Sequence, residues 1–444
     1  MPISDVFQGN DWEFRCSLAV VLTLFLAFLG SVILDTLNVP VTLFRQVIGF
    51  LFLTFVLDIL LLNALQIHHV NDQKPNFGIF TFPLVGSNMV PTLHFVNIVS
   101  SLSNYTYIVT GGGDTRPIRE MDRISIYAVP YTLERTSLRI IIGYVLREVR
   151  IAHSIMRLNK SVNFWFFSFG GDQYILPMLI AKLNRKKIFF VKAGSLQRNA
   201  KYSNDNLLKF TAVSSRINCF LSDKIILYSS ALIQEWHMEK YRHKILIAHR
   251  HFLDFTNFTV TTPLPNRPPL IGYIGRLSGE KGIENFTQAL PSILNDREEL
   301  RILIGGDGQL KEAVQASLQK EGLATRVHLP GWISHDDLPK YLNQLCLLVL
   351  PSYTEGLPNI MLEAMACGTP VLATSVGAIP DIITDGRTGF IMENNSPECI
   401  AANVIRALNS PELEQVAEHG RQFVQDNFTF ERVITRWKEI LEEI

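Results

Sequence analysis

Short apolar runs separated by helical stretches constrain the fold of this 444-residue chain more than any other feature. Strands that alternate with helices pair side by side as a parallel sheet. We predict strands at 77–82, 105–110, 164–168, 187–191 and 224–228, and further strands beginning near residues 270, 301, 327, 345 and 371. The chain is therefore predicted to be an α/β protein with two Rossmann-like domains.

A proline-rich segment separates the two groups of strands. Residues 262–269 include Pro263, Pro265, Pro268 and Pro269, a composition typical of a stiff linker. We place an N-terminal domain at 76–262 and a C-terminal domain at 263–444. The chain is long enough for each to enclose a substantial core.

Two glutamates in the C-terminal domain lie eight residues apart. The apolar run 345–350 ends at Pro351, so Glu355 is expected in the loop at the carboxyl end of a strand, where α/β folds bind ligands. Good helix formers follow Pro358 and stop at Gly368, which puts Glu363 inside a helix of about three turns. An isolated pair of this kind is usually a capping acid and a solvated glutamate, so neighbouring motifs decide its meaning.

Two cations flank a glycine turn after the strand that begins at residue 270. Arg276 and Lys281 there suit a diphosphate, because guanidinium and ammonium groups both bind phosphate oxygens. Either cation alone would ordinarily be a surface charge. Further along, residues 327–333 are predicted to be a short strand that runs into a loop, where backbone groups and Trp332 can meet a nucleobase, although a packed tryptophan is the commoner case.

These motifs, in this order, resemble the C-terminal domain of glycosyltransferase family 4, the retaining enzymes of the two-domain GT-B fold. The resemblance is strong over roughly residues 268–410. It implies that Arg276 and Lys281 hold the diphosphate of a nucleotide diphosphate sugar. It also implies that Glu363 binds the ribose and that Glu355 contacts the donor sugar.

The same resemblance extends to backbone groups and to the end of the chain. It implies that the backbone of Gly356, Leu357 and Pro358 lies near the sugar and the phosphates. It also implies that a last helix, at about 430–442, packs back across the linker.

No metal is needed for this chemistry. Two cations and a helix N-terminus can stabilise the charge that grows on a departing diphosphate. The sequence has no convincing Asp-x-Asp motif, and His335, Asp336 and Asp337 are expected to open a helix after Ser334. We therefore expect no metal and no cofactor beyond the donor itself.

Two uncharged apolar stretches precede the domains. We predict transmembrane helices at 16–34 and 46–67 within an anchor of residues 1–72. A hairpin bent at Pro40 is the alternative, and a cleaved signal peptide fits poorly because a second apolar stretch follows. Asp58 either marks a function within the membrane, pairs with a polar neighbour, or belongs to a helix shifted toward an interface.

The orientation of the anchor follows from the donor. The three segments that flank the two stretches carry one cation each, Arg15, Arg45 and Lys74, so charge does not determine the orientation. Sugar nucleotides are mostly cytosolic, so we expect both termini and the catalytic domains on the cytosolic side. Five scattered cysteines form no disulfide framework, in keeping with a reducing compartment.

A net charge of zero conceals an uneven distribution. Residues 131–250 contain 20 Lys or Arg against 7 Asp or Glu, a balance of +13, whereas residues 251–444 contain 15 against 25, a balance of −10. The basic part suits an anionic membrane surface or a phosphate-bearing lipid acceptor, and a solvated basic surface explains it equally well. Nucleic acid is a poorer explanation.

The N-terminal domain departs from the family pattern. Lys192 stands after a central strand where family members often carry a histidine, and residues 248–254 replace a common Pro-Asn-Gly-Val-Asp stretch. His249 and His251 in that replacement can approach the cleft, and packing or a surface role explains them at least as well. No residue is assigned as a general base.

The leading hypothesis is a membrane-anchored, retaining glycosyltransferase that moves a sugar to a lipid-linked glycan or another cell-envelope acceptor. A noncatalytic membrane-bound sensor or assembly subunit that binds a sugar nucleotide is the second, motivated by the missing histidine. An epimerase of the same fold ranks last, because it would need no acceptor and no anchor.

Overall fold

The computed structural model describes residues 74–82, 89–111, 115–130, 137–192 and 206–442. The predicted transmembrane stretches 16–34 and 46–67, with Asp58, lie outside these residues. Within the described ranges, every helix is too short or too polar to cross a bilayer.

The first domain is built on a parallel sheet of seven strands in the order β3-β2-β1-β4-β5-β6-β7. The strands are β1 (Phe77–Phe80), β2 (Thr106–Thr110), β3 (Ile124–Ala128), β4 (Phe164–Phe167), β5 (Lys187–Val191), β6 (Lys224–Leu227) and β7 (Ile245–Ile247). The five predicted strands are confirmed. The edge strands β3 and β7 were not predicted, because β3 is only partly buried and β7 has three residues.

The second domain has a parallel sheet of six strands in the order β10-β9-β8-β11-β12-β13. They are β8 (Leu270–Ile274), β9 (Arg301–Gly305), β10 (Val327–Gly331), β11 (Leu347–Leu350), β12 (Val371–Thr374) and β13 (Phe390–Met392). The strand order reverses between β8 and β11, and crevices at such reversals are the usual ligand sites of open α/β sheets. The prediction of an α/β protein with two parallel sheets is confirmed.

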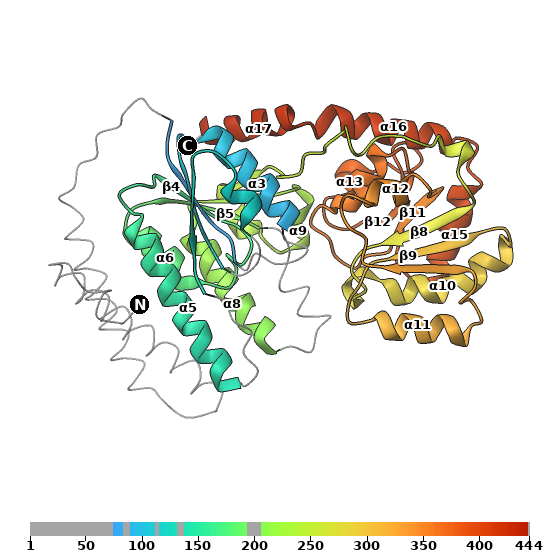
Figure 1. The fold of residues 1–444 in the computed structure, drawn as a ribbon, viewed down its shortest axis with the longest axis horizontal. Helices are drawn as coiled ribbons and strands as arrows, with labels where there is room; N and C mark the ends of the chain where they lie inside the picture. Colours follow the sequence, from blue (N-terminus) through green and yellow to red (C-terminus); the bar gives the residue numbers. More distant parts are fainter. Residues whose placement is uncertain (1–73, 83–88, 112–114, 131–136, 193–205, 443–444) are drawn as a thin grey trace.

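Helices cover both sheets (Figure 1). In the first domain they are α3 (Met89–Leu102), α4 (Arg116–Arg119), α5 (Ser137–Arg157), α6 (Ile175–Leu183), α8 (Asn206–Leu221) and α9 (Ala231–Glu235). In the second they are α10 (Ile283–Asp296), α11 (Lys311–Lys320), α12 (Leu338–Leu342), α13 (Asn359–Ala366), α14 (Ile379–Ile382), α15 (Pro397–Leu408) and α16 (Leu413–Asn427).

The last helix, α17 (Phe430–Glu442), returns to the first domain. Figure 1 shows α16 and α17 running along the same side of both lobes. Trp437 of α17 packs against the rings of Phe95 and Phe166, and its indole N–H donates to the carbonyl of His249 at 2.9 Å. The predicted helix at 430–442 and its return across the linker are therefore confirmed.

A buried arginine holds the proline-rich segment in place. The Arg267 guanidinium donates to the carbonyls of Thr262, Leu345 and Cys367 and to the hydroxyl of Thr369, at 2.7 to 2.9 Å. These bonds satisfy the charge inside the protein and tie the segment to the second sheet.

Candidate active site

Two loops at the carboxyl edge of the second sheet lie directly against each other. The loop after β8 ends at Gly282, whose φ is +69° and whose missing Cβ would lie 2.0 Å from the carbonyl oxygen of Pro351. Only glycine tolerates both the left-handed backbone and this approach. The contact brings the residue before it, Lys281, to the loop that carries Glu355.

Lys281 and Glu355 form the central ion pair of this site. The Nζ of Lys281 is 2.7 Å from both carboxylate oxygens of Glu355. The hydroxyl of Ser352 donates to Oε1 of Glu355, also at 2.7 Å. The Glu355 side chain is only 8% exposed, whereas that of Lys281 is 26% exposed. The carboxylate is thus fixed in place, and the ammonium retains access to solvent.

Arg276 lies on the same loop but is held more loosely. Its guanidinium makes a long contact of 3.4 Å to Glu280, and its side chain is 58% exposed. Its carbonyl, by contrast, accepts from the buried hydroxyl of Tyr273 at 2.7 Å. A fixed backbone with an exposed guanidinium suits a residue that reaches toward an anion.

Glu363 lies inside α13, as predicted, and is buried. Its carboxylate contacts Nε2 of His335 at 3.0 Å. This hydrogen bond raises the pKa of His335, against the opposing effect of partial burial. The sequence indicated only that His335 would help open a helix, so its pairing with Glu363 was missed.

The turn before α12 confirms that helix opening. The hydroxyl of Ser334 accepts from the amide of Asp337 at 3.1 Å and donates to its carboxylate at 2.7 Å. His335 therefore lies in the turn that leads into α12, which begins at Leu338.

The segment between the two glutamates is tightly packed. The carbonyl of Gly356 accepts from the amide of Ala378 at 2.8 Å, and the Leu357 side chain is buried. Pro358 is the residue before α13, so the helix begins at Asn359 and has eight residues. The predicted helix of about three turns is therefore too long by about one turn.

Trp332 follows β10, and the residue is 67% exposed. The commoner case of a packed tryptophan therefore does not apply. The loops around it are held together by close backbone approaches: the amide of Gly306 donates to the carbonyl of Gly331 at 2.7 Å. A Cβ on Gly306 would lie 1.9 Å from the carbonyl oxygen of Gly275, so the β8 and β9 loops also touch.

One hydrogen bond links the two domains beside this site. The carboxylate of Glu235, the last residue of α9, accepts from the amide of Gly377 at 2.7 Å. Gly377 itself has a φ of +65° and lies against the carbonyl of Glu355. Sequence analysis gave no signal for Glu235, because its partner is 142 residues away.

Lys192, where family members often carry a histidine, is committed to a structural contact. Its buried ammonium lies 2.7 Å from Asp172 and 2.9 Å from the hydroxyl of Ser215. Burial is the largest single influence and favours the neutral amine, but Asp172 and the neighbouring Cys219 and Tyr241 together outweigh it and raise the pKa of Lys192. This ammonium joins β5 to α8 and to the turn after β4.

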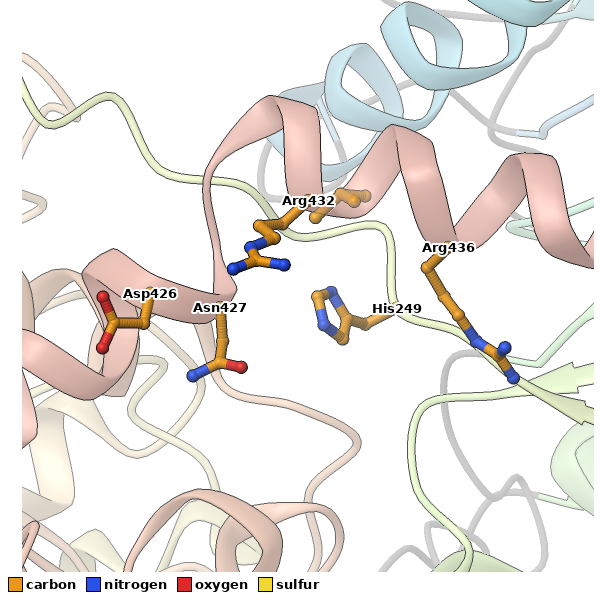
Figure 2. Close-up of a pocket in the computed structure, with 6 residues that line it drawn as sticks. His249, Asp426, Asn427, Arg432 and Arg436 are labelled. Carbon is orange, nitrogen blue, oxygen red and sulfur yellow. The ribbon is translucent and has the colours of Figure 1, made fainter.

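A cavity of about 440 Å³ lies where α16 passes into α17. Figure 2 shows its lining side chains, His249, Asp426, Asn427, Arg432, Val433 and Arg436. The His249 ring stacks on Phe428 at 4.5 Å, and burial lowers the pKa of His249 to about 4. Of the three readings, packing is therefore the one that the structure supports for His249.

The structure also bears on metals and cysteines. Across residues 74–442, apart from the gaps given above, no group of three or more His, Cys, Asp or Glu side chains is placed to hold a metal ion. Cys219, Cys346, Cys367 and Cys399 are unpaired thiols.

Comparison with known sequences matches the C-terminal part of the chain. Residues 254–423 match the model of the family Glycosyl transferases group 1. Over 153 residues the chain is 32% identical to the alpha-D-kanosaminyltransferase of Streptomyces kanamyceticus, covering 34% of this chain and 40% of that protein. Over 177 residues it is 27% identical to the capsular polysaccharide biosynthesis glycosyltransferase CapM of Staphylococcus aureus, covering 38% and 44%. The chain thus spans less than half the length of these curated relatives.

Comparison with solved structures extends over both domains. The Anabaena HepE structure in complex with UDP and glucose has a TM-score of 0.67 at 14% identity, covering 83% of this chain and all of that one. The apo lipopolysaccharide outer core galactosyltransferase WaaB has a TM-score of 0.61 at 18% identity, with the same coverage. At these identities the likeness concerns the fold alone, a GT-B arrangement of two parallel sheets.

Proposed function

We propose that this chain, whose family match and fold support a group 1 glycosyltransferase of the GT-B type, moves a sugar from a nucleotide diphosphate sugar to a cell-envelope acceptor. The single observation that carries this proposal is the Lys281–Glu355 pair at 2.7 Å, held at the carboxyl edge of the donor-domain sheet. A buried carboxylate beside a partly exposed ammonium supplies one group for a sugar and one for a phosphate.

The proposed donor site assigns a separate task to each residue. Arg276 and Lys281 bind the diphosphate and stabilise its growing charge as the sugar departs. Glu355 positions the donor sugar, and the N-terminus of α13, with the backbone of 356–358, lies beside the phosphates. Trp332 offers an exposed aromatic face to the base.

Glu363 is proposed to bind the ribose hydroxyls. In the structure its carboxylate is engaged by His335 at 3.0 Å. Ribose would either share the carboxylate with His335 or displace the imidazole, which is 41% exposed and able to move outward.

Transfer with retention is the finer part of the proposal. A leaving phosphate that accepts the proton of the acceptor hydroxyl requires no general base from the protein. The commitment of Lys192 to Asp172 is consistent with this route, because it removes that position from proton transfer.

A membrane-linked acceptor is supported by the sequence on the acceptor side. Residues 131–250 carry a balance of +13, next to the apolar stretches at 16–34 and 46–67. A basic domain held at an anionic membrane favours a lipid-linked, phosphate-bearing glycan. We place the catalytic domains on the cytosolic side, where sugar nucleotides are made.

A noncatalytic sugar-nucleotide sensor or assembly subunit is the second candidate. The observation that favours it is the ion-paired Lys192, which leaves the usual histidine position without an acid or base. Such a protein would bind the donor without releasing diphosphate.

The test uses detergent-purified full-length protein with a panel of sugar nucleotides and a membrane lipid extract. Nucleoside diphosphate release and sugar transfer are measured for wild type, Glu355→Gln and Arg276→Ala. Lys311→Ala is the matched control, because Lys311 contacts Asp307 four residues away at 3.4 Å, as Arg276 contacts Glu280. Transfer lost in both site variants and kept in the control supports the enzyme. Donor binding without release across the panel favours the sensor.

A further inference from the structure

Arg250, just after β7, is buried with two guanidinium nitrogens that lack a hydrogen-bond partner. Its residue exposure is 3%, and Nε and Nη1 of its guanidinium bond to nothing in the part of the chain that the structure describes. The guanidinium carbon lies 3.9 Å from the centre of the Phe169 ring and 5.5 Å from that of Tyr228. Aromatic faces hold this cation, and no carboxylate among the described residues pairs with it.

Comparison with the other buried arginine shows how unusual this is. Arg267 is 8% exposed and donates to carbonyls and a hydroxyl from three of its nitrogens. A buried charge without such partners is costly to the folded state. A structural role accounts for Arg267 but not for Arg250.

Several other polar atoms near Arg250 are also buried without a partner among the described residues. They are the hydroxyls of Ser168 and Tyr228 and the Nδ1 atoms of His94 and His251. Ser168 follows β4, Tyr228 follows β6 and Arg250 follows β7. They therefore gather at the carboxyl edge of the first sheet, where parallel sheets bind their ligands.

The two imidazoles add hydrogen-bonding capacity without adding charge. Burial lowers the pKa of His94 to about 4, and repulsion by His335 and Arg250 adds to this effect. Burial also holds the pKa of His251 well below its usual value. Neutral imidazoles each offer one donor. The influence of His335, which contacts Glu363, also shows that this cluster faces the donor domain.

One cation surrounded by neutral donors from several strands suits a single anionic group with several oxygens. A carboxylate is planar and offers two oxygens, whereas a phosphate accepts from several directions. We propose that Arg250, with the Tyr228 hydroxyl and the His251 imidazole, binds a phosphate group of the acceptor. That the phosphate belongs to an acceptor rests on the proposed function. The site itself is a second anion site, separate from that of Arg276 and Lys281.

The test compares Arg250→Met with Arg267→Met in full-length, detergent-purified protein. Thermal unfolding is followed by intrinsic fluorescence with and without inorganic phosphate, at ionic strength matched with chloride. Without phosphate, Arg250→Met is expected to unfold at a higher temperature than wild type, because it removes an unpaired buried charge. Arg267→Met is expected to unfold at a lower temperature, because it leaves several buried carbonyls without a hydrogen-bond donor.

Phosphate is added in the presence of saturating UDP, which fills the proposed site at Arg276 and Lys281. Under these conditions phosphate is expected to stabilise the wild type and Arg267→Met, but not Arg250→Met. We expect the phosphate affinity of Arg250→Met to fall about ten- to a hundredfold, the loss typical of a charge-assisted bond. An unchanged phosphate response in Arg250→Met overturns the inference, as does a wild type that phosphate does not stabilise. A lower unfolding temperature for Arg250→Met without phosphate assigns it a structural role and also overturns it.

Two further arms identify the source of the phosphate and separate the two proposals. Glycerol 3-phosphate is compared with a polyprenyl phosphate in detergent micelles, with phosphatidylcholine micelles as the blank. A response to the polyprenyl phosphate alone assigns a lipid-borne acceptor, and a response to both assigns recognition of phosphate itself. UDP stabilisation should survive in Arg250→Met, and its loss would assign Arg250 to the donor and overturn the inference. If phosphate stabilises the wild type but no sugar nucleotide does, the proposed function is contradicted and the phosphate site at Arg250 is retained.

Discussion

Lys281 and Glu355 lie 74 residues apart in the chain, yet the Nζ of Lys281 is 2.7 Å from both carboxylate oxygens of Glu355. The pair exists because the loops after β8 and β11 touch at Gly282 and Pro351. It buries the carboxylate of Glu355 and leaves the Lys281 side chain partly exposed. Three of the predictions below concern this contact or the groups around it.

The ion pair should couple its two residues in stability as well as in activity. Lys281→Met should destabilise the protein by about 2 kcal/mol, less than a fully buried pair because Lys281 is partly exposed. The double variant with Glu355→Gln should recover part of this loss, since no unpaired carboxylate remains. Urea unfolding of the three variants measures the coupling, and purely additive losses would contradict it.

Activity of the same variants should fall further than their stability. In the proposed mechanism, removing Lys281 takes away a cation at the leaving diphosphate, for which we expect a loss of about a hundred- to a thousandfold in kcat. Diphosphate release at saturating donor is the measurement. A change in KM with unchanged kcat would instead assign Lys281 to ground-state binding.

Gly282→Ala should disrupt the loop contact on which the pair depends. Its Cβ would lie 2.0 Å from the Pro351 carbonyl oxygen at a φ of +69°, which predicts a loss of about 2 kcal/mol. Gly279→Ala is the matched control on the same loop, because nothing lies within 4 Å of its Cβ. Equal unfolding free energies for the two variants would show that the loops can separate without cost.

The contact between His335 and Glu363 should make stability depend on pH. The hydrogen bond to Glu363 raises the pKa of His335 above its unfolded value. The stabilisation is therefore full below the unfolded pKa and is lost as pH rises through the folded pKa. Wild type should lose stability relative to His335→Gln as pH increases through neutrality.

The measurement is the difference in unfolding temperature between the two proteins from about pH 5 to about pH 9. UDP affinity should follow the opposite trend, because ribose competes with the protonated imidazole for the same carboxylate. A difference that stays constant with pH would show that the contact carries no charge.

Trp332→Ala should weaken nucleotide binding without affecting folding. The residue is 67% exposed, so loss of its indole should leave the unfolding free energy within about 0.5 kcal/mol. UDP affinity should fall by about 1 kcal/mol if the base stacks on the ring. Calorimetry with UDP measures this, and an unchanged affinity would remove Trp332 from the donor site.

Local patterns in the sequence were sufficient to predict much of the secondary structure of the C-terminal domain. The strand before Glu355, the helix around Glu363 and the turn at Ser334 depend on propensities and caps within a few residues. The alternation of strands and helices likewise predicted both parallel sheets. The edge strands β3, β7 and β13 were missed because β3 is only partly buried and β7 and β13 have three residues each.

The tertiary structure decided which of these groups meet. Gly282 is an ordinary turn glycine in the sequence, and only the packing of two loops makes it the point that joins Lys281 to Glu355. His335 contacts Glu363, and Lys192 pairs with Asp172. Both contacts form because an unpaired buried charge is costly, so a nearby partner of opposite charge is strongly favoured. Local sequence thus determined where strands and turns form, whereas the long-range packing of two sheets decided which charges are paired and left Arg250 without a partner among the described residues.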